Sequence, residues 1–148
     1  MLKELIREEL IFEHISFKNK EELFKHIQIN ASAIALVSDE FSKKLHEREL
    51  SFPTGLELKG LNVAIPHTDP EFVKKQFIAL YTLEEPVLFN RMDDPNKETE
   101  VSVVFVLGLN EPHAQLEILQ ELMGKLQDET FIKGIYEQKN KLDIFKKF

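Results

Sequence analysis

Cysteine is absent from this chain of 148 residues. Its absence excludes disulfide bonds, a catalytic thiolate and cysteine-ligated metal sites. Tryptophan is absent as well, whereas phenylalanine occurs 12 times, so we expect a core rich in phenylalanine. Apolar residues make up 43% of the chain and charged residues 30%, the ordinary balance of a soluble protein. We expect residues 1–148 to form a single domain, because this length suits one hydrophobic core.

Long hydrophobic runs and a secretory leader are also missing. No apolar segment approaches the roughly 20 residues that a membrane-spanning helix needs. The N-terminus does not combine a basic segment, an apolar run and a small-residue cleavage site, so we expect a cytoplasmic protein. The net charge of −7 argues against nonspecific nucleic-acid binding, which needs clustered lysine and arginine.

Sequence motifs of several common enzyme classes do not occur either. The nucleotide-binding patterns GxxxxGK[ST] and GxGxxG, the hydrolase pattern G-x-S-x-G and the metalloprotease pattern HExxH are all absent. His67, Asp69 and His113 could in principle bind a metal ion, but no clustered ligand set supports that reading. We therefore expect neither a metal ion nor a bound cofactor.

The first third of the chain predicts one strand and two helices. Residues 9–15 alternate loosely between apolar and polar, as a strand does. Asn19 and Glu22 resemble a capping box at the start of a helix. The apolar side of that helix consists of Leu23, Ile27, Ala31 and Ile34. A second helix is predicted to start at Ser38 and to carry Arg48 in its last turn.

Three further strands are predicted, at residues 61–66, 76–83 and 101–109. The last of them is almost wholly apolar and rich in β-branched residues, which is typical of a central strand buried on both faces. The polar segment 90–99 contains a proline and is predicted to be a loop.

The last third of the chain predicts helices. Residues 110–112 open the first of them, with proline in the favoured first turn. Its expected apolar stripe is Leu116, Leu119, Met123 and Leu126. Two shorter helices are predicted to begin at Asp128 and Asn140. The order of elements predicts a sheet covered by helices on both faces.

The stretch from Arg48 to His67 carries the strongest functional signal. Ile65 precedes a proline and is therefore pushed toward extended backbone, while Pro66 has no N–H for strand pairing. His67 thus lies where an apolar strand stops pairing. A neutral imidazole is a good nucleophile near neutral pH, and a hydrogen bond to one ring nitrogen fixes which nitrogen is free.

Arg48 and Glu49, Phe-Pro-Thr-Gly at 52–55 and Ala-Ile-Pro-His at 64–67 together resemble a known active-site segment. It is that of the IIA domains of the bacterial phosphoenolpyruvate:sugar phosphotransferase system (PTS), in the fructose/mannitol class. Phe-Pro-Thr-Gly and the Asp93-Asp94 pair look most like galactitol-type members. The resemblance implies one type-2 IIA domain with an α+β fold, a three-layer α/β/α sandwich around a mixed β-sheet. It is weakest in the first 40 and last 20 residues.

The resemblance implies that His67 accepts a phosphoryl group and that Arg48 lies beside it. A guanidinium matches phosphoryl oxygens in a forked geometry, although a cation is also favoured at a helix C-terminus for structural reasons. His113 falls in the first turn of a helix, where anions are favoured. Fructose- and mannitol-type members place a second histidine about there, whereas galactitol-type members need not, so its role stays open.

Three further residues in the segment have two interpretations each. Glu49 could pair with neighbours of Arg48 or orient a histidine, and Thr54 could offer its hydroxyl to the phosphoryl group. Turn and cap chemistry explains both equally well. For Gly55 the preferred interpretation is a turn that needs a residue without a Cβ.

The implied function is that of a phosphotransferase with a phosphohistidine intermediate. In this family the small protein HPr donates the phosphoryl group, and a cysteine of a IIB component accepts it for a membrane permease, IIC. The galactitol-type features suggest a polyol as the carbohydrate. One alternative is a regulatory module whose phosphorylation state controls a partner protein, and another is an unphosphorylated fold relative, such as a domain of an anion transporter.

Two partners in turn must meet His67, so we expect a docking surface around it. Exposed apolar side chains rimmed by carboxylates would suit such transient contacts with a basic partner. The candidates are Phe52, Phe72 and Glu71. For any one phenylalanine, burial in the core is the competing interpretation.

Overall fold

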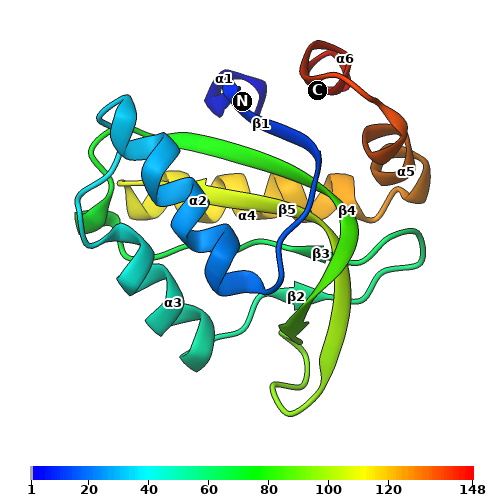
Figure 1. Cartoon of the computed structure of the whole chain (residues 1–148), viewed down its shortest axis with the longest axis horizontal. Coiled ribbons are helices and arrows are strands. Elements are labelled where there is room, and N and C mark those ends of the chain that lie inside the picture. The colour runs from blue at the N-terminus through cyan, green and yellow to red at the C-terminus, as the bar shows by residue number, and fades with distance from the viewer. Residues whose placement is uncertain (1) are drawn as a thin grey trace.

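The computed structural model describes residues 2–148, which form a five-stranded sheet in the order β1-β4-β5-β3-β2 (Figure 1). The strands are β1 (Ile6–Ile15), β2 (Gly55–Leu56), β3 (Val63–Ala64), β4 (Phe77–Asn90) and β5 (Glu98–Gly108). β1 pairs in parallel with β4, and β3 pairs in parallel with β5, whereas β4 and β5 are antiparallel, as are β2 and β3. The sheet is therefore mixed, as predicted.

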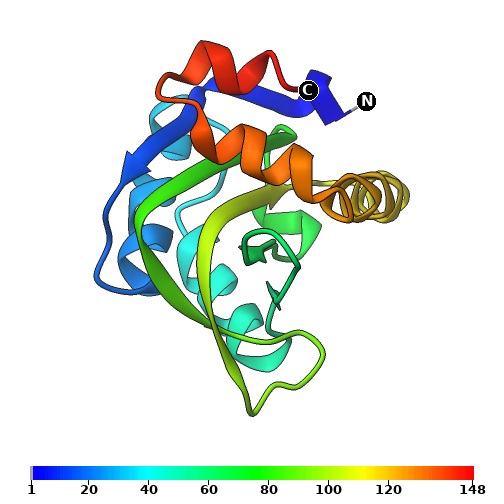
Figure 2. The same cartoon turned by 90° about the vertical axis from the view of Figure 1, so that its right-hand side faces the viewer.

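Helices cover both faces of this sheet (Figure 2). One layer is formed by α2 (Lys20–Ala33) and α3 (Phe41–Ser51). The other contains α1 (Leu2–Leu5), α4 (Pro112–Leu126), α5 (Glu129–Glu137) and α6 (Lys141–Phe145). Val104 and Val106 of β5 belong to the core under the first layer, and Val103 and Phe105 to the core under the second. The predicted three-layer sandwich is confirmed, and β5 is the central strand, buried on both faces. No helix within residues 2–148 combines the length and the apolar character needed to cross a membrane.

Three predicted helix caps are confirmed. Caps can be predicted from sequence because they depend only on neighbouring residues. The side chain of Asn19 accepts a hydrogen bond from the N–H of Glu22 at 3.0 Å. The Glu22 carboxylate bonds the N–H of Lys18, one residue earlier than in a standard capping box. Asp128 and Asn140 cap α5 and α6 in the same way.

Two predictions at helix ends were wrong. The helix expected from Ser38 begins at Phe41, and the Ser38 hydroxyl caps no N–H, since it has no hydrogen-bond partner among the described residues. Ile34 lies just beyond the end of α2 and is 40% exposed. The next residue, Ala35, has a φ of 58°, a left-handed conformation that ends the helix.

The strand predicted at residues 61–66 is shorter, since β3 contains only two residues. The Asn62 side chain accepts from the N–H of Leu58 at 3.1 Å and donates to the carbonyl of Glu100 at 3.1 Å. It thereby closes the loop between β2 and β3 before the strand begins. Pro66 has no N–H and ends the pairing on the other side.

The predicted loop at residues 90–99 is longer than the loop in the structure. β4 continues to Asn90 and β5 begins at Glu98, so that only residues 91–97 form the hairpin turn. Backbone pairing continues here through Phe89 with Thr99 and through Asn90 with Glu98. Strand pairing satisfies backbone groups whatever the side chains are, so polar composition misled the prediction.

The apolar stripe predicted on α4 was rotated by part of a turn. The residues that face the sheet core are Ile118, Leu122 and Leu126, at helical spacing. Leu116 is 58% exposed, whereas Leu119 and Met123 are partly buried. Leu119 and Met123 form a neighbouring stripe, which lies on the side of α4 toward His67.

Candidate active site

His67 lies at the edge where β3 ends beside β5. It forms an isolated parallel bridge with Leu107, whose N–H donates to the carbonyl of Pro66 at 2.9 Å. The ring turns back toward its own strand, with Nδ1 2.8 Å from the carbonyl oxygen of Ile65. A carbonyl can only accept, so Nδ1 carries the proton. In the neutral ring the lone pair therefore resides on Nε2.

The surroundings of His67 favour this neutral ring. Burial lowers the pKa of His67 below its ordinary value of 6.5, because the charged form loses solvation. The hydrogen bond to Ile65 opposes that shift, the charge of Arg48 adds to it, and the charge of Asp69 opposes it. Since burial dominates, the lowered pKa leaves the ring of His67 uncharged at neutral pH.

An NMR titration of the imidazole protons should give His67 a midpoint below 6.5. In Arg48→Ala the midpoint should rise, because a nearby cation has gone, and in Asp69→Asn it should fall. A wild-type midpoint above 6.5 would contradict the account of a ring kept neutral by burial.

Arg48 approaches the same place from the last turn of α3. Its Nη1 donates to Oδ1 of Asp69 at 3.1 Å, and its guanidinium lies 5.0 Å from the ring centroid of Phe52. The Nε of Arg48 is buried and finds no acceptor within residues 2–148. A buried donor without an acceptor is costly, so this N–H is an unsatisfied polar group beside His67.

Glu49 and Thr54 fix the loop that follows α3. The buried carboxylate of Glu49 accepts from the N–H of Thr54 and from its hydroxyl, each at 2.8 Å. Burial raises the pKa of Glu49, while the two bonds from Thr54 and the charge of Lys20 oppose that rise. The hydroxyl proton of Thr54 is thus directed at Glu49, and the pair acts on the shape of the loop.

Thr54→Val should lower the free energy of unfolding by about 2 kcal/mol, because the buried Glu49 carboxylate loses one of its donors. Thr54→Ser is the matched control, since it keeps the hydroxyl and removes only a methyl group. Urea unfolding monitored by circular dichroism measures both. Equal losses in the two variants would show that the hydroxyl contributes nothing.

Gly55 has an ordinary negative φ, so its backbone conformation does not require glycine. It lies in β2, where an added Cβ would meet the carbonyl oxygen of Asn90 at 2.6 Å. The expected reason for this glycine, a turn, is therefore replaced by the close approach of another strand.

An apolar cavity of about 340 Å³ joins these parts, and we refer to it below as the apolar cavity. Its lining consists of Arg48, Phe52, Pro53, Thr54, Ile65, His67, Met92, Leu119 and Met123. Segments distant in sequence meet here: the loop after α3, the end of β3, the β4–β5 turn and α4. The sequence did not indicate that the β4–β5 turn and α4 reach this cavity, because nothing in the residue patterns of these two segments links them to His67.

His113 takes no part in that lining. It lies in the first turn of α4 and is exposed, and no hydrogen bond or ion pair to it occurs in the part of the chain that the structure describes. The nearest lining residue on the same helix, Leu119, is six positions further on, about 9 Å along the axis. Its supporting role stays a prediction. His67, Asp69 and His113 do not form a metal-binding cluster, and residues 2–148 contain no group of three such side chains.

The three expected docking residues differ in placement. Phe52 is 64% exposed at the rim of the apolar cavity. Phe72 is partly buried against the core of the α2–α3 layer, with the Lys44 amine 5.6 Å from its ring centroid. Glu71 is exposed in the short 3-10 helix η1 (Pro70–Phe72), on a second hollow that Arg48 also lines.

A mixed sheet between helical layers, with an uncharged histidine and an arginine on one apolar cavity, defines an α+β protein with a candidate site around a histidine. Residues 4–148 match the family described as phosphoenolpyruvate-dependent sugar phosphotransferase system, EIIA 2. The chain belongs to this family, which confirms the resemblance seen in the sequence.

Relatives and solved structures agree with this placement. The galactitol-specific EIIA component of Escherichia coli K12 is 35% identical over 121 residues, covering 82% of this chain and 80% of that protein. IIA mannitol from Escherichia coli has the same fold, with a TM-score of 0.77 at 20% identity, covering 96% of this chain and 97% of that one. The nitrogen regulatory protein IIA-Ntr from Neisseria meningitidis gives a TM-score of 0.81 at 24% identity, covering 98% and 97% of the two chains.

Proposed function

We propose that this protein is a phosphocarrier that takes a phosphoryl group from phospho-HPr on Nε2 of His67 and passes it to a IIB component. The observation that carries the proposal is the free Nε2 of a neutral ring on an open apolar cavity. A solved relative supports the acceptor, because IIA mannitol of Escherichia coli forms a complex with phosphorylated IIB mannitol. The 35% identity to a galactitol-specific component supports a galactitol-like polyol as the carbohydrate.

The transfer proceeds in two displacements. The Nε2 lone pair of His67 attacks phosphorus, and the bond from phosphorus to the donor's histidine nitrogen breaks, returning its electron pair to the donor ring. A cysteine thiolate of IIB then attacks phosphorus, and the bond to Nε2 breaks. His67 is regenerated with its proton still on Nδ1, so no net proton is gained or lost on this chain.

Arg48 has a defined part in this scheme. Charge spreads over three phosphoryl oxygens during transfer, and catalysis is mostly positioning and electrostatic stabilisation. The guanidinium of Arg48 lines the apolar cavity and is partly exposed, so its N–H groups can donate to those oxygens. Its Nη1 is meanwhile held by Asp69, which fixes the direction of the fork.

The proposal is tested by incubating the protein with phosphoenolpyruvate, enzyme I and HPr. One acid-labile phosphoryl group per chain is expected, and it should move to a purified IIB protein that carries its cysteine. A wild-type protein that remains unlabelled would overturn the proposal.

The same experiment separates transport from regulation. The whole chain acts here as a single IIA domain in the cytoplasm, serving a IIC permease through IIB. A protein that accepts the label but passes none to any galactitol-type IIB would instead be a regulatory module. The 35% identity to a galactitol-specific component, against 24% to IIA-Ntr, supports the transport role over that alternative.

A further inference from the structure

The turn of the β4–β5 hairpin, residues 91–97, lies against β2. The N–H of Met92 donates to the carbonyl of Gly55 at 2.8 Å, and Gly55 forms a parallel bridge with Arg91. This contact requires a glycine at position 55, because a Cβ there would clash with the carbonyl oxygen of Asn90. The turn is thereby brought to the rim of the apolar cavity.

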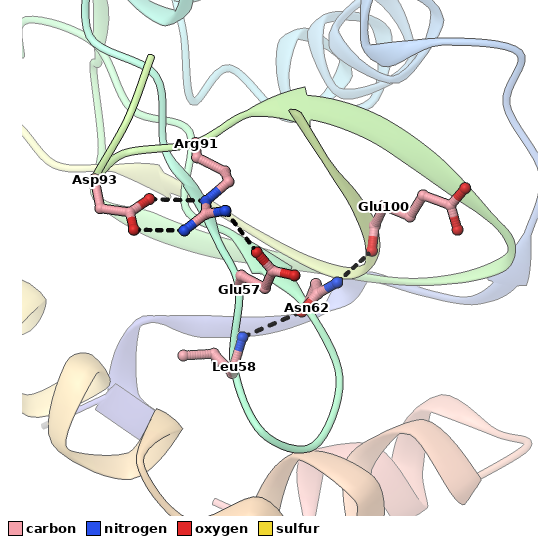
Figure 3. Close-up of polar contacts among 6 residues, drawn as sticks. All are labelled: Glu57, Leu58, Asn62, Arg91, Asp93 and Glu100. Carbon is pink, nitrogen blue, oxygen red and sulfur yellow. Dashed lines mark hydrogen bonds and ion pairs between the residues drawn. The ribbon is translucent and has the colours of Figure 1, made fainter. Parts of the chain in front are cut away.

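Arg91 joins this turn to the β2–β3 loop through two carboxylates (Figure 3). Its Nε and Nη2 donate to the two oxygens of Asp93 at 2.9 and 2.6 Å, and its Nη1 lies 2.8 Å from Oε2 of Glu57. Only 21% of the Arg91 side chain is exposed. We call Arg91, Asp93 and Glu57 the carboxylate clamp. A planar guanidinium can bind both carboxylates at once, whereas an ammonium lacks this geometry.

The loop that carries Glu57 is itself fixed, so the clamp has a rigid anchor. The Asn62 side chain bonds the N–H of Leu58 and the carbonyl of Glu100, which ties the loop to β5 (Figure 3). The clamp therefore sets the position of the hairpin turn relative to the sheet.

Met92 lies between the two clamped residues of the turn. It is 42% exposed, and its side chain lines the apolar cavity together with Leu119 and Met123 of α4. An unbranched methionine side chain adapts its shape to what it contacts. Ion pairs at both neighbouring positions hold its backbone, while its side chain stays free to repack.

We propose that Arg91 is a positioning residue for phosphoryl transfer. The carboxylate clamp holds Met92 in the wall of the apolar cavity, where Met92 contacts the docked phosphoryl donor. The inference rests on the proposed function, because it concerns docking at the same site. Arg91 does not line the cavity and therefore acts through Met92.

The test is the rate of transfer from phospho-HPr, measured against its concentration for wild type, Arg91→Ala, Met92→Ala and the double variant. Each single variant should raise KM about fivefold, the effect of one displaced interface side chain. The kcat should be unchanged, because His67 and Arg48 are untouched. The double variant should equal the single ones, since two changes on one path are not additive.

Two controls separate docking from general stability. Lys133→Ala removes an ion pair to Glu129 on α5, 2.6 Å long and outside the lining of the cavity, and should leave KM at the wild-type value. Arg91→Lys keeps the charge without the fork and should give an intermediate KM. Thermal unfolding of each variant reports any loss of stability.

The inference is overturned by additive effects in the double variant, by a fall in kcat at unchanged KM, or by a change in thermal stability alone. Unchanged KM in both single variants, with normal wild-type labelling, overturns the role of the clamp and leaves the proposed function standing. A wild-type protein that accepts no phosphoryl group overturns the proposed function, and this inference with it.

Discussion

His67→Ala is expected to abolish the acid-labile phosphoryl label that enzyme I and HPr place on the wild-type protein. The physical reason is that Nε2 of His67 holds the free lone pair at the apolar cavity, and alanine has no nucleophile to replace it. Label per chain is measured after a time long enough for the wild type to reach saturation. The variant should show no detectable label.

The fold should survive this change, because His67 is only partly buried and its one hydrogen bond runs to a neighbouring carbonyl. His113→Ala is the matched histidine control and should keep the full label, since His113 is exposed and does not line the cavity. Label at the wild-type level in His67→Ala would show that another side chain is the acceptor. A slower rate in His113→Ala would give that histidine the supporting role that the sequence left open.

Arg48→Ala is expected to slow transfer from saturating phospho-HPr by roughly a hundredfold, the usual loss for one preorganised donor to a developing anion. Arg48→Lys should lose less, about tenfold, because lysine keeps the charge but not the fork. Rapid-quench measurement of labelled protein gives both rates.

The structure supplies a matched control for the arginine. Arg7 is 35% exposed and pairs with Glu9, much as Arg48 is 36% exposed and pairs with Asp69. Arg7 lies on β1 and does not line the cavity, so Arg7→Ala should transfer at the wild-type rate. Equal rates for wild type and Arg48→Ala would remove Arg48 from the site and leave it a structural cation at the end of α3.

Local signals in the sequence determined much of the secondary structure. The caps at Asn19, Asp128 and Asn140 were predictable because the accepting side chain and the N–H that donates to it lie within a few residues of each other. The apolar run at 101–109 predicted the central strand, since burial on both faces leaves no polar alternation. Pro66 placed His67 at the end of a strand for a similarly local reason.

Only the tertiary structure decided what surrounds His67. Whether the polar residues 90–99 form a loop or extend the hairpin depends on backbone pairing between β4 and β5. The side-chain composition does not reveal this pairing, because backbone groups make it. The placement of Leu119 and Met123 depends on how α4 rotates against the sheet, because two neighbouring stripes of that helix are apolar. Met92 lies at the apolar cavity on a turn that contacts distant segments, through the bond from its N–H to the Gly55 carbonyl and the ion pair of Arg91 with Glu57. Contacts between distant segments set these positions, and a linear pattern does not encode the distances between such segments.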